Sequence, residues 1–320
     1  MGKTSVRDGA GREAADDRSR RNGPVVAIVG PTAAGKSDLA LDVVESLGAG
    51  GAEIINADSM QLYRGMDIGT AKVPPNERRG IPHHLLDVWD VTRTADVASY
   101  QRDAREITDR LLAEGRIPVL VGGSGLYVRA VLDELEFPGT DPAVRAVLEA
   151  RLAELGPEAL HAELAAVAPE AAEAILSSNG RRIVRALEVV ALTGGFTARL
   201  PEHRSRYDVV VIGLDRPDLD DRIVLRVDQM WAAGLVDEVR ELEKVGLAEG
   251  RTASRALGYA QVLGWLQGEF ASEEDARTAT VTATRRFARR QRSWFKRDPR
   301  INWLDQPDVG TVRRLVESGV

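Results

Sequence analysis

The sequence contains no cysteine, which excludes a disulfide framework, a thiol nucleophile and a cysteine zinc site. The adjacent pair His83 and His84 lacks the spacing with which a helix presents two ligands to zinc. No apolar run approaches the length of a membrane span, and the charged N-terminus lacks the apolar core of a secretory signal. We therefore expect a cytoplasmic protein with no membrane partner, in which residues 1–23 form a disordered tail.

The net charge argues against a protein that binds nucleic acid with its whole surface. With 43 Lys and Arg against 49 Asp and Glu, the formal charge is −6. Hydrophobic residues make up 43% of the 320 residues and charged residues 29%, a globular balance with ample material for a core. The length predicts one large domain or two intimate ones. A local basic groove is compatible with this charge, so the distribution of charge matters more than its sum.

One stretch near the N-terminus has the pattern of a phosphate-binding loop. The β-branched run 25–29 predicts a buried strand, which leads through GPTAAGKS into a helix predicted to end near Leu47. This loop matches GxxxxGK[ST] in its strand-loop-helix context. Backbone N–H groups at a helix N-terminus attract anions, Lys36 adds a positive charge, and the hydroxyl of Ser37 is available to Mg²⁺. We therefore predict binding of a di- or triphosphate, and the candidate residues are Gly30, Pro31, Thr32, Ala33, Ala34, Gly35, Lys36 and Ser37.

Further apolar runs alternate with helical segments along the chain. Strands are predicted at 53–56, 117–121, 208–214 and 301–304, and helices at 96–114, 218–245, 254–267 and 273–297. This alternation predicts an α/β fold, with a P-loop NTPase-like parallel sheet flanked by helices. Residues 60–94 have little periodicity, which predicts ordered active-site loops rather than core.

Asp58 follows the predicted strand 53–56 and is a candidate catalytic residue. Because parallel crossovers bring the carboxyl ends of strands to one edge of a sheet, we expect Asp58 near the phosphate loop. The strand 117–121 ends in glycines, where a kinase of this class usually carries an acidic residue that helps to hold magnesium. Asp58 is therefore a metal helper or a general base, and a cap or turn residue is the alternative.

Residues 138–206 form alanine- and glutamate-rich helices without convincing strands, which predicts a helical insertion domain. The predicted core then comprises residues 24–137 and 207–320. Arg222 and Arg226 lie one helical turn apart and can reach one anion together.

Seven cations share one broad face of the helix 273–297, and the sequence places no acidic partner beside them. This favours phosphate contact over a solvated helix face and indicates a localised groove for RNA or a nucleotide. The seven are Arg285, Arg286, Arg289, Arg290, Arg292, Lys296 and Arg297.

Taken together, six motifs in this order resemble the bacterial tRNA dimethylallyltransferase family. They are GPTAAGKS, NADSMQLYRGMDIGTAK, PHHLLD, LVGGSGLY, RALGYAQ and TRRFARRQRSWF, and they extend over most of the chain. The resemblance implies transfer of a dimethylallyl group from dimethylallyl diphosphate to N6 of the adenosine just 3′ of the anticodon. The implied partners are this donor, whose diphosphate the P-loop holds with Mg²⁺, and the tRNA anticodon stem-loop. We further expect a monomer.

The resemblance also implies roles for single residues. Asp58 stands where the family has its general base, Ser124 lies near the transferring centre, and Arg226 reaches the diphosphate. The implied tRNA contacts are Asp58, Ser59, Met60, Gln61, Arg145, Arg181, Arg182, Ile183, Val184, Arg185, Arg255, Ala256, Leu257, Gly258, Tyr259 and Ala260. In three places the chain departs from the family pattern: Ser124 is more often Thr, Ala260 replaces a common basic residue, and Ala34 replaces a frequent Ser.

Two other classes of function fit parts of the sequence. A small-molecule kinase would place ATP on the phosphate loop, as such loops are often labelled, and would clamp its acceptor with arginines. The glycine end of the strand 117–121 and the extent of the basic helix argue against it. An RNA-binding protein with a non-catalytic loop is the third interpretation. The intact Lys36–Ser37 pair near Asp58 argues against that one.

Overall fold

The computed structural model describes residues 23–196 and 202–318. The tail expected over residues 1–23 therefore lies outside the described residues, apart from Gly23. The chain divides into two compact units, one running to Asp133 and resuming at Ser205, the other comprising Glu134–Arg204. Within the described residues, no helix combines the length and apolarity that crossing a membrane requires.

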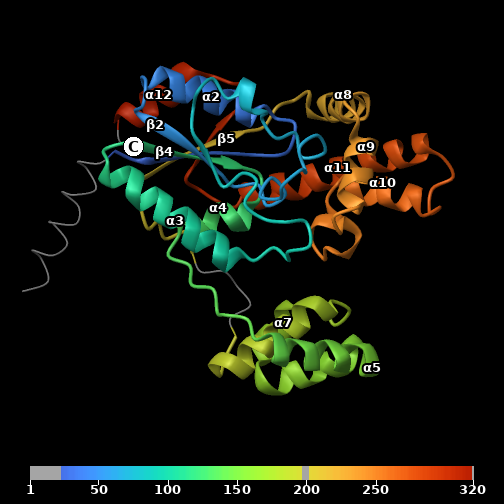
Figure 1. Ribbon diagram of the computed structural model, residues 1–320. Helices are drawn as coiled ribbons and strands as arrows, with labels where there is room; N and C mark the ends of the chain where they lie inside the picture. The colour runs from blue at the N-terminus through green and yellow to red at the C-terminus, as the bar shows by residue number, and fades with distance from the viewer. Residues whose placement is uncertain (1–22, 197–201, 319–320) are drawn as a thin grey trace, which may run out of the picture. The chain divides into compact units, whose positions relative to one another are not determined.

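The first unit contains a six-stranded, all-parallel sheet in the order β3-β2-β4-β1-β5-β6, which confirms the predicted α/β class (Figure 1). The strands are β1 (Val25–Val29), β2 (Ala52–Asn56), β3 (His83–His84), β4 (Ile117–Gly122), β5 (Val209–Leu214) and β6 (Ile301–Leu304). Its helices are α2 (Lys36–Ser46), α3 (Val97–Ala113), α4 (Gly125–Leu132), α8 (Leu219–Ala232), α9 (Leu235–Glu243), α10 (Tyr259–Leu266), α11 (Glu273–Phe295) and α12 (Val309–Ser318).

Alternate residues of β1 enter two hydrophobic clusters, because successive side chains of a strand point to opposite faces. Val25, Ala27 and Val29 join the cluster that α3, α4 and α10 complete. Val26 and Ile28 join the cluster that α2, α8 and α12 complete. Figure 1 shows α2 and α12 on one side of the sheet and α3 and α4 on the other. A strand buried on both faces thus delivers the phosphate loop at its carboxyl end.

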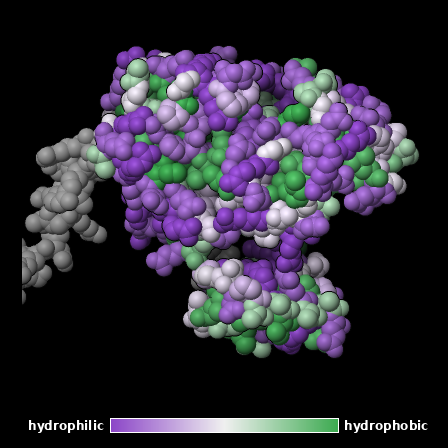
Figure 2. Space-filling model, in the orientation of Figure 1, coloured by the Kyte–Doolittle hydropathy of each residue, from purple (hydrophilic) through white to green (hydrophobic). Residues whose placement is uncertain are grey.

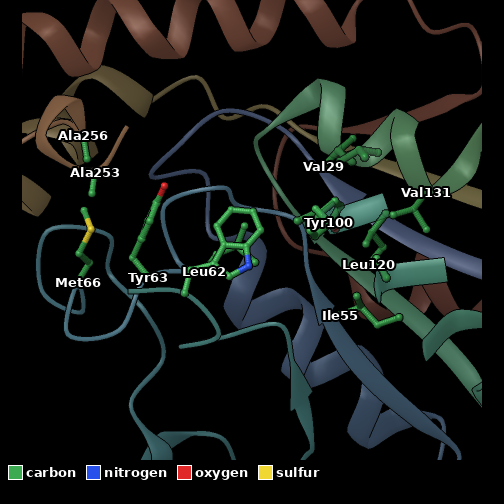
Figure 3. Packing of buried hydrophobic residues seen from close by; sticks show 14 of the residues in the cluster. Val29, Ile55, Leu62, Tyr63, Met66, Tyr100, Leu120, Val131, Ala253 and Ala256 are labelled. Carbon is green, nitrogen blue, oxygen red and sulfur yellow. The ribbon is translucent and has the colours of Figure 1, made fainter. Parts of the chain in front are cut away.

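The segment 60–94 consists mostly of turns, as predicted, but it also contributes to the core, so the prediction was wrong in setting it apart from the core. Leu62, Tyr63 and Met66 are fully buried in the cluster that also contains Ala253 and Ala256 (Figure 3). His83 and His84 form the short edge strand β3, parallel to β2. The segment is aperiodic because turns, rather than a helix or a long strand, present these side chains to the core.

Two predicted helices have different bounds. The single helix expected over 218–245 is two helices, α8 and α9, because Gly234 adopts a left-handed conformation with φ 97°. The helix expected from residue 254 begins at Tyr259, after Gly258 with φ 85°, and a short 3₁₀ helix, η3 (Ala253–Arg255), precedes it. The C-terminal helix α12 was not predicted.

In the second unit, the described residues form three helices around their own core. They are α5 (Pro142–Val167), α6 (Pro169–Ala174) and α7 (Gly180–Thr193), and α5 is interrupted at Gly156, with φ 80°. Leu160, Leu164 and Ile183 are fully buried in this core. The unit therefore has a hydrophobic core independent of the sheet.

The chain leaves the sheet-containing unit and returns to it at one place. Asp133 and Ser205 form an antiparallel bridge, and Arg206 donates its backbone N–H to Leu132 O at 2.7 Å. Arg300 Nη1 donates to Asp133 Oδ1 at 2.7 Å and to Ser205 Oγ at 2.6 Å. Asp133 is fully buried and also pairs with Arg129. The point where the chain leaves the sheet-containing unit, Asp133, is therefore fixed to the point where it returns, Ser205.

Candidate active site

The phosphate loop lies between β1 and α2, as the sequence predicts. Gly30 is required there, because a Cβ would lie 2.3 Å from Leu214 O and its φ of 140° disfavours other residues. Ala33 is left-handed, with φ 64°, and its carbonyl accepts a hydrogen bond from Arg222 Nε at 2.8 Å. Arg222 thus supports the loop itself. Lys36 Nζ donates to Pro31 O at 2.7 Å.

Asp58 lies at the same edge of the sheet, directly after β2. Its Oδ1 accepts the backbone N–H of Met60 at 2.9 Å, and its own N–H donates to Asn56 Oδ1 at 2.9 Å. Within the described chain, Oδ2 of Asp58 has no hydrogen-bond partner. The carboxylate is therefore oriented by one oxygen while the other remains available to a substrate.

Ser124 follows β4 and approaches the same turn. Its Oγ accepts the backbone N–H of Ser59 at 3.1 Å and lies 3.2 Å from Ser59 Oγ. The carboxyl ends of β1, β2 and β4 thus bring the phosphate loop, Asp58 and Ser124 to one edge, as the parallel topology predicts.

One open cavity, with about 640 Å³ of empty space that includes open solvent, lies between the phosphate loop and Asp58, and Ser124 does not line it. It is lined by Thr32, Lys36, Ser37, Asn56, Asp58, Gln61, Thr70, Arg226 and Gln291, and by apolar side chains that include Ile54 and Val73. The surface visible in Figure 2 is mostly hydrophilic, with apolar residues in small groups.

Two cations that line the cavity, Lys36 and Arg226, form no ion pair with any residue that the structure describes. Burial, the nearby charge of Arg226 and, in the opposite sense, Asp58 leave the pKa of Lys36 at about 8. Burial likewise lowers the pKa of Arg226, whose Nε has no hydrogen-bond partner among the described residues. Its Nη2 donates to Thr70 O at 3.3 Å. Because unpaired buried charge is costly, this arrangement is suited to an anion such as a diphosphate.

Gln291 is a residue of the site that sequence reasoning missed. Its Oε1 accepts the backbone N–H of Thr32 at 2.9 Å, and its Nε2 donates to Gly123 O at 2.9 Å. The amide thereby joins the phosphate loop to the turn before Ser124. Its position in line with Ala288 and Phe295, on the apolar face of an arginine-rich helix, was the available signal.

The residues present fit a magnesium ion held mainly by substrate oxygens. Ser37 lies in the first turn of α2 and lines the cavity, and its hydroxyl makes no hydrogen bond within the described residues. Those residues contain no cluster of three or more His, Asp or Glu that could form an all-protein metal site. Magnesium in phosphate sites usually keeps waters and phosphate ligands, so one hydroxyl suits this mode.

The segment 255–260 exposes only part of its side chains. Arg255 is exposed, whereas Ala256 and Tyr259 are buried in the core. Tyr259 therefore cannot offer its ring to an RNA in this conformation.

The arginines of the helical unit serve two purposes. Arg145 and Arg185 pair with Glu188, which is fully buried. Although burial raises the pKa of Glu188, hydrogen bonds from both arginines hold it below its usual value. Arg181 and Arg182 are exposed and free of this cluster, whereas Ile183 and Val184 belong to the core.

On α11 the expectation that seven cations lack acidic partners was wrong for Arg292. Its Nε donates to Asp215 Oδ1 at 2.6 Å and its Nη2 to Arg216 O at 3.1 Å, which ties α11 to the loop after β5. Arg286, Arg289 and Arg290 are exposed on the same helix.

Comparison with known proteins identifies similar chains. Residues 61–298 match the family described as IPP transferase. The chain is 67% identical to a tRNA dimethylallyltransferase of Parafrankia sp. (strain EAN1pec), covering 98% of this chain and 99% of that relative. It is 70% identical to one of Thermobifida fusca (strain YX), covering 89% and 91%.

Solved structures give the same result. The crystal structure of a full-length tRNA isopentenylpyrophosphate transferase from Bacillus halodurans is 36% identical, with a TM-score of 0.67 and coverage of 93% of this chain and 96% of that one. A eukaryotic dimethylallyltransferase acting on tRNA, 24% identical, has a TM-score of 0.76 over 92% of this chain and 78% of its own, which supports the fold.

Proposed function

The chain belongs to the tRNA dimethylallyltransferase family and is a prenyltransferase, and we propose that it transfers a dimethylallyl group to N6 of the adenosine 3′ to the anticodon. The donor is dimethylallyl diphosphate. The observation that carries this proposal is the cavity lined both by Asp58, one of whose carboxylate oxygens has no hydrogen bond among the described residues, and by two cations, Lys36 and Arg226, that form no ion pair with a described residue. Such a site can hold a leaving anion and accept a proton at the same time.

The diphosphate of the donor would lie on the phosphate loop. Lys36, Arg226 and the backbone N–H groups at the start of α2 would compensate the charge that develops as it departs. The hydroxyl of Ser37, with the diphosphate oxygens, would hold Mg²⁺, which when bound adds further positive charge at the leaving group. Gln291 would keep the loop in the binding conformation through Thr32.

Asp58 would act as the general base. The exocyclic amine of adenine is a weak nucleophile, because its lone pair is delocalised into the ring. As N6 bonds to C1 of the dimethylallyl group, the bond from C1 to the diphosphate oxygen breaks and its electron pair leaves with the diphosphate. One N6 proton passes to Oδ2 of Asp58, the oxygen without a hydrogen bond among the described residues.

The tRNA anticodon stem-loop would be bound by exposed cations. Arg181 and Arg182 of the helical unit, Arg255, and the exposed arginines of α11 are available for phosphate contacts. Arg145 and Arg185 would act by keeping α7 in place through Glu188. The adenosine would leave the stack of the loop, which costs little for a single-stranded base. One chain supplies every group named, so the reaction needs no second subunit.

The test is the isosteric variant Asp58→Asn, assayed with unmodified tRNA and labelled dimethylallyl diphosphate. We expect turnover to fall by a factor of about 10²–10⁴, as for loss of a general base, while tRNA binding is retained. Asp90→Asn, which alters an exposed carboxylate paired with Arg64, is the matched control. Unchanged transfer by Asp58→Asn would remove the assignment of the base, and turnover of ATP in place of label transfer would indicate a kinase.

A further inference from the structure

The segment Met66–Lys72 forms part of the wall of the active-site cavity. The carbonyl oxygen of Thr70, which lines the cavity, accepts hydrogen bonds from Gln61 Nε2 at 3.1 Å and from Arg226 Nη2 at 3.3 Å. This carbonyl is the hydrogen-bond partner of the Arg226 guanidinium within the described residues. The position of Thr70 therefore determines where that guanidinium points.

Glu238 of α9 holds the backbone just before Thr70. Its Oε2 accepts the N–H groups of Asp67 and Ile68 at 3.2 and 2.8 Å, and its Oε1 accepts that of Gly69 at 3.3 Å. One carboxylate thus receives three consecutive backbone donors. Charged acceptors form stronger hydrogen bonds than neutral ones, so this contact fixes the turn more firmly than a neutral side chain could.

Tyr259 holds Glu238 and the segment from the other side. Its hydroxyl donates to Glu238 Oε1 at 2.5 Å, and burial, together with the Glu238 charge, raises its pKa, so the hydroxyl stays protonated as a donor. Its ring packs on Gly69, where an added Cβ would lie 2.4 Å from Tyr259 Cε2. Only glycine fits between the ring and the backbone.

The far end of the segment is fixed by Lys72, a buried cation. Its Nζ donates to Tyr63 O at 2.9 Å and pairs with Asp67 at 2.6 Å and Asp87 at 2.5 Å. The segment is therefore anchored at both ends, and Thr70 lies between the anchors.

We propose that Glu238 and Tyr259 are positioning residues: by fixing the segment Met66–Lys72, they hold the Thr70 carbonyl where it orients Arg226 toward the departing diphosphate. This inference rests on the proposed role of Arg226. It also gives the buried tyrosine of the motif RALGYAQ a function inside the protein rather than at the RNA surface.

The experiment compares Glu238→Gln and Tyr259→Phe with Glu241→Gln. Glu241 lies on the same helix and pairs with Lys244 at the surface, so its variant is the matched control. The readouts are the dissociation constant of inorganic pyrophosphate with Mg²⁺, kcat, and the KM for tRNA. In Glu238→Gln an amide N–H₂ replaces one acceptor opposite the backbone donors. We expect pyrophosphate affinity and kcat to fall about tenfold, a smaller loss for Tyr259→Phe, and an unchanged KM for tRNA.

A double-mutant cycle with Arg226→Ala separates positioning from general destabilisation. If Glu238 acts through Arg226, Glu238→Gln has no further effect on pyrophosphate binding once Arg226 is removed. Additive losses, or a change confined to the KM for tRNA, would overturn the inference. If Glu238→Gln fails to fold, Tyr259→Phe, which removes one oxygen, carries the same test. Weakened binding by Arg226→Ala but not by either positioning variant would refute this inference alone. Unchanged binding by Arg226→Ala would refute the proposed diphosphate site as well.

Discussion

Donor binding is expected to depend on pH through Lys36. In the folded, unliganded protein the pKa of Lys36 is lowered from its ordinary value of 10.5 to about 8, first because of burial and then because of the charge of Arg226. A diphosphate interacts with the charged form of the lysine. Above pH 8 a growing fraction of the protein must therefore take up a proton before or during binding, and the observed affinity falls.

The size of the expected change in donor affinity follows from the pKa of Lys36. The apparent dissociation constant is multiplied by one plus ten to the power of pH minus 8, which is about 1.1 at pH 7 and about 11 at pH 9. Binding should therefore weaken about tenfold over this interval, or about 1.4 kcal/mol. The donor contributes little to this change, because the last ionisation of a phosphate group, with a pKa near 6, is almost complete at pH 7.

Titration calorimetry with dimethylallyl diphosphate and Mg²⁺, without tRNA, provides the assay, since no transfer occurs without an acceptor. Lys36→Arg is the control, because a guanidinium stays charged throughout this range and should abolish the pH dependence whatever its own affinity. Arg226→Ala removes the neighbouring like charge and should move the onset of the loss to higher pH. A dissociation constant that is the same at pH 7 and pH 9, or an equal change in Lys36→Arg, would refute the reasoning.

Folding stability should change in the opposite direction. Between pH 8 and 10.5 the unfolded chain binds a proton at Lys36 that the folded chain does not, so the free energy of unfolding rises with pH from this residue. Weaker binding together with a more stable unliganded fold would distinguish titration of Lys36 from alkaline unfolding.

Three further substitutions test separate features. Gln291→Ala leaves the part-buried Thr32 N–H without its acceptor and releases the phosphate loop from α11, so calorimetry should show donor binding weaker by about 1 kcal/mol with little change in tRNA affinity. Gly30→Ala places a methyl group 2.3 Å from Leu214 O at a φ of 140°, so urea unfolding should show a loss of about 3 kcal/mol or more; a wild-type midpoint would contradict the close packing. Glu188→Ala removes the shared partner of two partly exposed arginines and should destabilise the helical unit by about 1.5–3 kcal/mol. The stabilisation by Glu188, present above its unfolded pKa near 4.5, should disappear as the pH falls through its lower folded pKa.

Much of the sheet was predictable because its strands are short apolar runs. The strands at 25–29 and 301–304 have the predicted bounds, and the phosphate loop and Asp58 lie at one edge because parallel topology requires it. The apolar pattern of each strand and the right-handed crossover between parallel strands were sufficient to predict these features.

The features that sequence did not reveal depend on contacts between distant segments. Gln291 and Thr32 are 259 positions apart. The alignment of Gln291 with Ala288 and Phe295 predicts that its side chain is buried, but it does not show that the amide meets a phosphate loop. Tyr63 and Met66 lie in an aperiodic stretch, and their burial depends on helices that follow much later in the chain. The break at Gly234 had a local signal, since glycine commonly ends helices, but apolar periodicity on both sides concealed it.

The bridge between Asp133 and Ser205 affects which insertions and deletions this sequence can tolerate in evolution. Because Arg300 already clamps the two ends together, joining them directly would cost little loop-closure entropy. The segment between them brings its own core, so neither unit needs the other to bury its apolar side chains. The segment between Asp133 and Ser205 can therefore evolve as a separate domain. Insertions, deletions or its replacement by another segment should leave the geometry of the candidate active site unchanged. Under the proposed function, in which Arg181 and Arg182 of this segment contact tRNA, selection could act on RNA binding and on the chemistry as two nearly separate traits.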